Sequence, residues 1–553
     1  MKQAPILAKM LIAGVIAGLG LCALAEDGER NVKHVLVISV DGLHSVDAER
    51  FIASHPDSAL AELASHAARY TTAGTSRPSD SFPGVLSLVT GGSPASADVF
   101  YDVSWSRTQW APGPAGCTGS PGQQTTYDET IDLLTVVNGF AIDQNRIDPT
   151  LLPWGMKDGT CQHIYPHDFV KVNTVFDVVK KAGLGRTAWA DKHAAYDLVT
   201  GPTGMAVDDL YTPEVTNPET LNDASGNPIP GPYDGDYGIV GGMATRDATV
   251  SVNCTLDNDR RKFKALINEI NGYDHTGTGP QVGTPTVFGT DLQAISVGQK
   301  VSLNNTDGSC NAPDPAGVNG KPGGYVDGSG APTAVLQYAL EQTDLQLGMV
   351  VAALKARHIY DSTLVIISAK HGQTPIDPLK TNKIGHLQGL VSAYASSSDS
   401  VAQAIVNAGE NEDDIALIWL KDQSLAAAAA QWLRDNNTAA KLHIQQVLSG
   451  DLLKLRFRDP ATDDQTPDII VVPELGVIYT SSTAKNAEHG GFSNDDNNVA
   501  LIVSQPGIHE KVIKGAVLTT QIAPTVLKAL GLDPAELKAV QIEHTEVLPG
   551  LGL

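Results

Sequence analysis

HVLVISVDG, the stretch from His34 to Gly42, is a continuous apolar run that ends in an Asp-Gly pair. A strand buried on both faces has this pattern, because no face of it needs alternating polar residues. A second run, TLVIIS at Thr363–Ser368, leads into Lys370, His371 and a glycine. Both runs predict parallel strands whose carboxyl ends carry polar side chains.

Apolar strands alternate with helical patterns along much of the chain. Further strands are predicted at 186–193, 285–291, 415–420, 468–472 and 499–504. Helices are predicted at 58–69, 82–90 with Ser81 as its cap, 172–183, 333–357 and 519–532. Residues 95–170 and 200–330 are largely rich in glycine, proline and polar residues, and we expect loop-rich insertions there. The pattern predicts an α/β fold, with a mostly parallel sheet covered by helices on both faces.

Composition and the N-terminus indicate an exported, acidic protein. The formal net charge of −24 repels nucleic acid at long range, so we expect no nucleic-acid duplex as a partner. Residues 1–25 have the basic start, apolar run and Ala-Leu-Ala cleavage site of a signal peptide. No later run approaches the ~20 apolar residues of a membrane span. We therefore expect a secreted or periplasmic protein, with residues 26–553 forming one domain with insertions.

Four cysteines remain after the expected signal peptide. An even count in an exported chain favours two disulfides. We expect Cys117–Cys161 and Cys254–Cys310, since each pair closes a loop-rich segment, while the two other pairings stay open. Cys22 follows the bulky Leu21, which disfavours lipid attachment at that cysteine.

Polar residues gather where chemistry is expected in a parallel sheet, at the carboxyl ends of its strands. Asp41, Asp291 and His371 follow predicted strands, and His489 stands in a late glycine-rich loop. Each has an ordinary explanation, since Asp-Gly is commonly a turn and a lone histidine is usually structural. Together they favour a site, because carboxylates and imidazoles are the ligands of hydrolytic divalent metals.

Ser81 stands at the start of a predicted helix and is a candidate nucleophile. The helix dipole stabilises a negative charge there by only about 0.3–1 kcal/mol, which is too little to ionise a hydroxyl. A bound metal lowers the pKa of a coordinated oxygen much further. Ser81 as a nucleophile therefore predicts a metal in contact with its hydroxyl.

Five blocks together resemble the alkaline phosphatase superfamily, most closely its type I phosphodiesterase/nucleotide pyrophosphatase branch. They are VISVDG (37–42), SDSFPGVLSLVTGGSP (79–94), LVIISAKHGQ (364–373), EHGGF (488–492) and TQIAPTVLKALGL (520–532). The resemblance implies a three-layer α/β sandwich. It also implies that Ser81 is the nucleophile and that Asp41, Asp291, His371 and His489 are metal ligands, with Ser81 also touching the metal.

Three positions depart from the pattern of that branch. Lys370 stands where the branch has aspartate, Ile295 where it has histidine, and Asp102 near the place of an asparagine. Two complete zinc sites cannot be assembled from the usual ligands, so we expect one or two divalent ions, zinc or manganese. A protonated lysine cannot ligate a metal but can replace a cation's charge. Lys370 is therefore expected to pair with Asp102 or with a substrate phosphoryl oxygen.

Three more residues are candidates from their position alone. Asp191 and His193 follow a predicted strand and are possible replacement ligands or pocket residues. Lys300 is a candidate substrate-binding cation beside Asp102.

The resemblance implies a secreted metal-dependent phosphoric ester hydrolase, closest to a phosphodiesterase, acting on a small anionic phosphoester. A phosphomonoesterase, a phosphonate hydrolase and a non-catalytic binding protein on the same fold are the alternatives. A sulfatase is disfavoured, because Val85 stands where its motif needs arginine.

Overall fold

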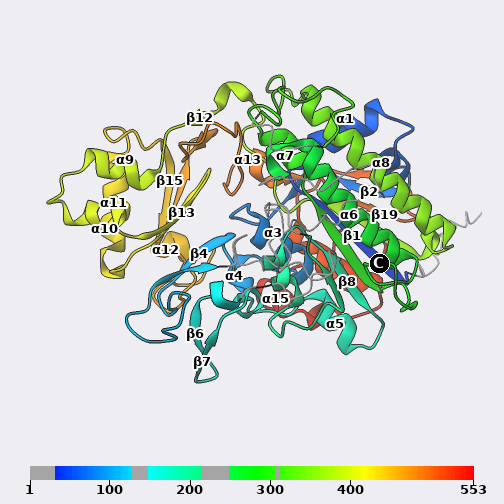
Figure 1. The fold of residues 1–553 in the computed structure, drawn as a ribbon, viewed down its shortest axis with the longest axis horizontal. Helices are drawn as coiled ribbons and strands as arrows, with labels where there is room; N and C mark the ends of the chain where they lie inside the picture. The colour runs from blue at the N-terminus through cyan, green and yellow to red at the C-terminus, as the bar shows by residue number, and fades with distance from the viewer. Residues whose placement is uncertain (1–31, 127–146, 148, 214–247, 307–311) are drawn as a thin grey trace, which may run out of the picture.

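A central eight-stranded sheet organises the computed structural model, which describes residues 32–126, 147, 149–213, 248–306 and 312–553 (Figure 1). The strand order is β20-β2-β19-β11-β1-β10-β8-β9. Strand β19 runs antiparallel to both neighbours and the other pairs are parallel. The strands are β1 (His34–Val40), β2 (Ala67–Tyr70), β8 (Thr187–Ala190), β9 (Asp209–Tyr211), β10 (Val287–Leu292), β11 (Thr363–Ser368), β19 (Ile502–Ser504) and β20 (Lys511–Ile513). This confirms the predicted α/β fold.

Helices cover both faces of this sheet, which explains why β1 is apolar without alternation. Leu36 and Ile38 point into one hydrophobic core, and Val35 and Val37 into the other. The first core is completed by α1 (Ser45–Ser54), α2 (Ala59–Ala64), α6 (Val252–Ile270), α7 (Ala294–Lys300) and α8 (Ala334–Ala356). The second is completed by α3 (Ser81–Thr90), α4 (Pro94–Ala97), α5 (Val175–Lys181), α14 (Ile522–Ala529) and α15 (Lys538–Glu543).

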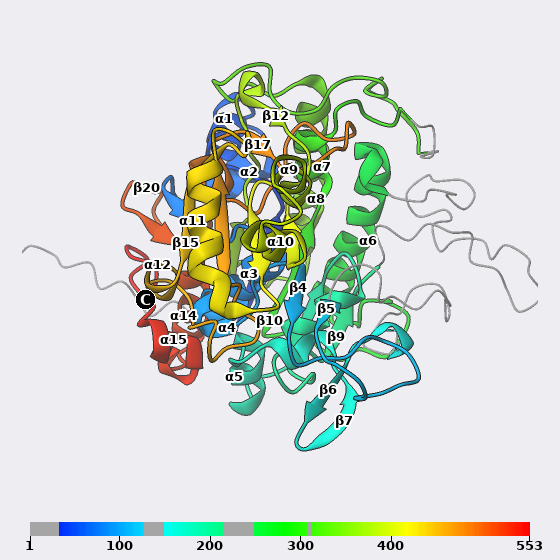
Figure 2. The ribbon, with the colours of Figure 1, turned by 90° about the vertical axis from the view of Figure 1, so that its left-hand side faces the viewer.

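A second, antiparallel sheet forms a separate lobe, seen at the left of Figure 1 and facing the viewer in Figure 2. Its order is β13-β14-β16-β15, with strands β13 (Gly409–Glu412), β14 (Ala416–Trp419), β15 (Ile444–Ser449) and β16 (Ile469–Pro473). Helices α9 (Leu387–Tyr394), α10 (Ser400–Val406) and α11 (Ala426–Asn436) pack on one face. The strands predicted at 415–420 and 468–472 exist, but they belong to this lobe and not to the central sheet.

Short elements fill the connections. They are β3 (Ala73–Gly74), β4 (Val103–Ser106), β5 (Gln123–Thr126), β6 (Trp154–Lys157), β7 (Thr160–His163), β12 (Asn382–Lys383), α12 (Asp451–Lys454), β17 (Val477–Ile478), α13 (Asn494–Asn497), β18 (Asn498–Val499) and β21 (Val517–Leu518). The disulfide Cys117–Cys161 is present as predicted. The second predicted pair includes Cys310, which lies outside the described residues, as does the signal peptide expected at 1–25.

Three sequence predictions about helices need correction. The helix predicted at 58–69 is the shorter α2, because residues 67–70 form β2 instead. The insertion expected at 200–330 contains the 19-residue helix α6, whose apolar stripe of Val252, Leu256, Phe263, Leu266 and Ile270 is interrupted by the buried Asp259 and Lys262. Ser81 is the first residue of α3 and not its cap, since the side chain of Asp80 accepts from the Phe82 amide.

Helix α8 begins after the capping residue Thr333 and ends at Ala356, as predicted. Within the described part of the chain, no helix combines the length and the apolar character needed to cross a bilayer.

Candidate active site

Parallel register brings the predicted polar residues to one edge of the central sheet. Ser39 of β1 lies opposite Asp291 of β10 on one side and Ser368 of β11 on the other. The loops beyond are tied by backbone hydrogen bonds, from the Asp41 amide to the Leu292 carbonyl (2.8 Å) and from the Gly42 amide to the His371 carbonyl (3.1 Å). Strand pairing alone therefore brings Asp41, Asp291 and His371 together.

Helix α3 delivers Ser81 to this edge. Its hydroxyl Oγ lies 3.3 Å from Nε2 of His371. The helix can approach so closely because residue 84 is glycine: a Cβ there would lie 2.4 Å from the Lys370 carbonyl oxygen. Ser81 and His371 are both buried, with 2% and 1% of their surface exposed.

The ring of His371 is oriented for proton transfer. Its Nδ1 lies 2.8 Å from the carbonyl oxygen of Gly372, which can only accept, so Nδ1 carries the proton in the neutral ring. Nε2 then presents its lone pair to the Ser81 hydroxyl and lies 3.5 Å from Oδ2 of Asp41. A serine hydroxyl facing the free nitrogen of an imidazole is the geometry that a nucleophile and a general base require.

Lys370 sits among three carboxylates and is fully buried. Its Nζ lies 2.9 Å from Asp291, 3.5 Å from Asp41 and 3.7 Å from Asp191, and it donates to the Tyr196 hydroxyl (2.8 Å). Burial favours the neutral amine, but Asp191, Asp291 and Asp41 raise the pKa of Lys370 well above its usual value. The expected pairing with Asp102 is therefore wrong: the lysine reaches along the strand ends, to the carboxylates of neighbouring strands.

Asp41 stays ionised at the centre of this group. Burial alone would raise its pKa, but Lys370 and His371 hold the pKa of Asp41 well below its usual value. Asp291 behaves in the opposite way, because burial and the neighbouring Asp41 raise its pKa. Asp191 is held by hydrogen bonds from the Trp189 indole and the Lys192 amide, both 2.9 Å.

Gln293 is a site residue that the sequence analysis missed. Its amide nitrogen donates to Oδ2 of Asp41 (2.6 Å) and to Oδ2 of Asp291. Asp259, from the unpredicted helix α6, accepts from the backbone amides of Gln293 and Ala294 and so fixes this turn. The only signal in the sequence is that Gln293 follows a strand-end aspartate by two residues.

Lys192 was also not singled out, although it follows Asp191 directly. Its Nζ lies 3.4 Å from the Ser81 hydroxyl, 3.3 Å from the Gln293 amide oxygen and 4.0 Å from Asp41. About 12% of the side chain is exposed, unlike that of Lys370. The ammonium group therefore stands next to the nucleophile and within reach of solvent.

His489 closes the other side of the site. Its ring stacks on that of His371, with centroids 3.7 Å apart and planes 4° from parallel. Burial, together with the positive charges of Lys300 and Lys192, holds the pKa of His489 well below its usual value, so the ring is neutral. Its nitrogens lie 3.7 Å from Asp80 and 3.6 Å from Glu488.

The two predicted substrate-binding residues lie on this His489 side. Lys300 acts electrostatically on His489 and Glu488. Asp102 faces Asp80, and burial together with Asp102 raises the pKa of Asp80 well above its usual value. His193 is brought near but not into the group, because its ring packs edge-on against Phe82 and Tyr196.

The five residues expected to bind a divalent metal, Asp41, Ser81, Asp291, His371 and His489, do not all turn toward one point. Lys370 and Gln293 direct nitrogen donors at Oδ2 of Asp41 and at Oδ2 of Asp291, whereas Oδ1 of each carboxylate has no hydrogen-bond partner among the described residues. An imidazole lone pair lies in the ring plane, so the parallel rings of His371 and His489 do not aim at one ion. In the described ranges, no three acidic, histidine or cysteine residues are grouped to hold a metal.

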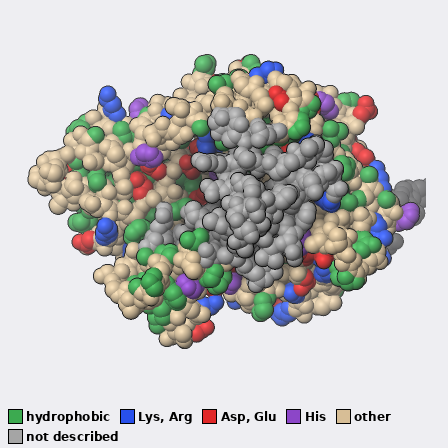
Figure 3. Space-filling view, viewed as in Figure 1, with side chains coloured by type: hydrophobic (Ala, Val, Ile, Leu, Met, Phe, Trp, Pro, Cys, Tyr) green, Lys and Arg blue, Asp and Glu red, His purple; other side chains and the backbone are tan. Residues whose placement is uncertain are grey.

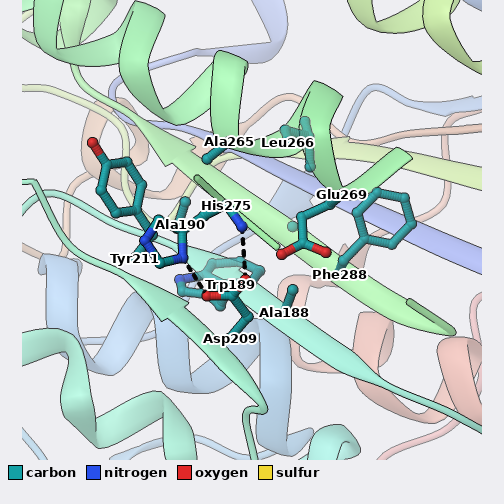
Figure 4. Close-up of a pocket in the computed structure, with 11 residues that line it drawn as sticks. Ala188, Trp189, Ala190, Asp209, Tyr211, Ala265, Leu266, Glu269, His275 and Phe288 are labelled. Atoms are coloured by element: carbon teal, nitrogen blue, oxygen red, sulfur yellow. Dashed lines mark hydrogen bonds and ion pairs between the residues drawn. The ribbon is translucent and has the colours of Figure 1, made fainter. Parts of the chain in front are cut away.

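A small cavity lies away from this edge, between the outer strands β8 and β9 and helix α6 (Figure 4). His275 stacks on Tyr211 and its Nδ1 lies 2.5 Å from Asp209 there. The volume is about 10 Å³, enough for one water molecule. The space-filling view in Figure 3 shows acidic side chains near the lobe and scattered lysines and arginines on that face.

A mostly parallel sheet covered by helices on both faces, with a helix that brings a serine to the carboxyl edge of its strands, is an alkaline phosphatase-like fold. The family model of type I phosphodiesterase / nucleotide pyrophosphatase matches residues 35–113 and 315–495. Over these two segments the chain is similar to the type I phosphodiesterase / nucleotide pyrophosphatase family of the alkaline phosphatase superfamily. The sequence resemblance is thereby confirmed. No curated protein matches the chain in sequence.

Solved structures agree in fold. Wild-type alkaline phosphatase PafA is 13% identical with a TM-score of 0.57, covering 91% of this chain and 96% of its own. Murine ectonucleotide pyrophosphatase/phosphodiesterase 5 (12% identical) and phosphonoacetate hydrolase from Sinorhizobium meliloti 1021 with phosphonoformate (13%) both score 0.46, with the same coverages. We base no inference on these two weaker superpositions.

Proposed function

We propose that this chain hydrolyses small anionic phosphoric esters through Ser81, with His371 as its general base. The observation that carries the proposal is the 3.3 Å contact between the Ser81 hydroxyl and Nε2 of His371, in a ring whose Nδ1 faces a carbonyl. Similarity to this family supports phosphoric ester bonds as the substrate class.

In the first step Ser81 Oγ attacks phosphorus and its proton passes to Nε2 of His371. The bond from phosphorus to the leaving oxygen breaks, that oxygen takes a proton from solvent, and His371 returns the serine proton to solvent. In the second step water attacks the phosphoserine, neutral His371 accepts a proton from that water, the bond from phosphorus to Ser81 Oγ breaks, and Oγ takes the proton back from His371. Each step exchanges one P–O bond for another, so no external oxidant or reductant is required.

Lys192 is the group best placed to stabilise the phosphoryl oxygens. It lies 3.4 Å from the nucleophile and keeps part of its side chain exposed. The Phe82 amide, near the start of helix α3, already donates its hydrogen bond to the Asp80 side chain and is not directed at a phosphoryl oxygen. A cation aimed at the place where charge develops supplies the main stabilisation of such a transition state.

Lys370 keeps Asp41 ionised and fixed, and Asp41 in turn faces His371. We assign Lys370 a positioning role, because its Nζ is enclosed by Asp41, Asp191, Asp291 and Tyr196. The disulfide and the expected signal peptide at 1–25 support export to an oxidising compartment.

Nitrophenyl phosphate and bis-nitrophenyl phosphate test this proposal and separate a monoesterase from a diesterase. Ser81→Ala should lose at least 100-fold in kcat/KM on the preferred ester. The matched control is Ser87→Ala, a buried serine of the same helix that bonds to Thr519 and not to the site, and it should stay within twofold of wild type. Equal activity of Ser81→Ala and wild type would refute the assignment of the nucleophile.

A further inference from the structure

Two buried carboxylates outside the catalytic group lie close together, and only Oδ2 of Asp496 receives hydrogen bonds, from the Ser493 hydroxyl (2.7 Å) and the Ser493 amide (3.2 Å). Asp414, just before β14, is 3% exposed, and Asp496 of α13 is 1% exposed. Neither carboxylate oxygen of Asp414 has a hydrogen-bond partner in the described chain, and neither has Oδ1 of Asp496. A buried carboxylate left in this condition is costly unless a proton or a cation accompanies it.

The oxygens of these residues converge beside Gly491. A Cβ built on Gly491 would lie 2.5 Å from Oδ2 of Asp496, 2.9 Å from the Asp414 carbonyl oxygen and 3.0 Å from Oδ2 of Asp414. Both aspartates also line a cavity of about 20 Å³, which has room for one ion or water molecule. The other polar side chains that line it are Thr374, Gln445, Glu474 and Ser493.

Among the described residues no lysine or arginine forms an ion pair with either carboxylate, although the Arg77 guanidinium acts electrostatically on Asp496. Lys485, the nearest ion-pairing lysine on the same loop, lies 2.6 Å from Glu488 instead. Arg77 donates from Nε to the Asn497 amide oxygen. Burial and the neighbouring carboxylates of Asp496 and Asp413 raise the pKa of Asp414 well above its usual value.

We propose that Asp414 and Asp496 bind one hard divalent cation of the Ca²⁺ class, through their carboxylates and the Asp414 main-chain carbonyl. Carboxylate and carbonyl oxygens are the ligands that Ca²⁺ prefers, whereas zinc favours nitrogen and sulfur, and no histidine or cysteine lines the cavity. The site is separate from Ser81 and does not rest on the proposed function.

The position of the site gives the cation a structural role. The Asp496 carbonyl accepts hydrogen bonds from the Gly372 amide and from the Ser79 hydroxyl, both 2.7 Å. Gly372 follows His371, and Ser79 precedes Ser81 by two residues. A cation that fixes Asp496 therefore also fixes the two loops that bring nucleophile and base together.

Calcium binding by the mature chain tests the proposal. The protein is treated with EGTA, exchanged into metal-free buffer at pH 7.5 and titrated with CaCl₂ by calorimetry, and its thermal unfolding is followed with and without CaCl₂. We expect one Ca²⁺ per chain and a midpoint that rises by several degrees. Asp414→Asn should weaken Ca²⁺ binding at least tenfold, while Glu546→Gln, which removes an exposed carboxylate that does not line the cavity, should bind as wild type.

If Asp414→Asn fails to fold, the CaCl₂ titration of the wild-type protein alone tests whether the chain binds Ca²⁺. Absence of heat and of a midpoint shift in wild type would overturn the proposal and leave a proton shared between the two carboxyls. An undiminished calcium response in folded Asp414→Asn would also overturn it, because the ion would then bind elsewhere.

Discussion

Removing the charge of Lys370 should destabilise the whole domain. Its Nζ is fully buried with carboxylates of Asp291, Asp41 and Asp191 at 2.9, 3.5 and 3.7 Å. At an effective dielectric constant near 20, one such contact is worth about 4–5 kcal/mol, partly offset by the cost of burying the charges. Losing one member of a buried ion pair typically costs about 3–5 kcal/mol.

Lys370→Met keeps most of the side-chain volume and should therefore lower the free energy of unfolding by about 3–5 kcal/mol at pH 8. The loss should be smaller at pH 5, because uptake of a proton by one of the three carboxyls relieves their repulsion. Urea unfolding followed by tryptophan fluorescence measures both values. Lys380→Met, at an exposed position, is the control and should change stability by less than about 0.5 kcal/mol.

A second substitution identifies the partner. Lys370→Met combined with Asp291→Asn should recover part of the lost stability, because it removes the nearest uncompensated carboxylate. If Lys370→Met unfolds at the wild-type urea concentration, the lysine is not the counter-ion of these carboxylates and this reasoning fails.

Three further substitutions test the roles of Lys192, Lys370 and Asp98. Lys192→Met should lower kcat/KM by 10-fold or more with little change in stability, whereas unchanged kinetics would remove it from the phosphoryl site. Lys370→Asp should bind Zn²⁺ at least tenfold more tightly than wild type by calorimetry, because it exchanges a cation for a ligand beside Asp41 and His371; equal affinities would contradict this. Burial and Asp463 raise the pKa of Asp98 to about 8, above its unfolded value near 4. Protonated Asp98 therefore stabilises the fold at low pH, and this stabilisation is lost as the pH rises through 8. Asp98→Asn should therefore be more stable than wild type at pH 8.5 but not at pH 4.5. A gain in stability that does not vary with pH would contradict a raised pKa of Asp98. The backbone φ of 69° at this position also suits asparagine.

The central strands were predictable because burial on both faces leaves an unmistakable apolar run. The same rule could not assign residues 415–420 to the lobe, because β14 is also buried on both faces. Its Ile418 and Leu417 point in opposite directions, into two different hydrophobic cores. Helix α6 was not predicted although Val252, Leu256, Phe263, Leu266 and Ile270 recur at helical spacing, because the charged Asp259 and Lys262, which form a 3.0 Å ion pair, interrupt that stripe.

Part of the site followed from strand order. Asp41, Asp291 and His371 had to meet, because parallel strands end at one edge. The partners of Lys370 could not be predicted without the register that sets it beside Asp291. The contacts of Lys192 and Gln293 depend on how far their side chains extend toward neighbouring strand ends. The sequence shows only that each residue stands close to an aspartate.

The most direct test of the account is to trap the covalent intermediate. The mature protein is mixed with nitrophenyl phosphate, quenched in acid within milliseconds to seconds, digested and analysed by mass spectrometry. The account predicts one added phosphoryl group on the peptide that contains Ser81, and its absence from Ser81→Ala. Rapid turnover of the ester with phosphate on no peptide, or with phosphate on another residue, would contradict it.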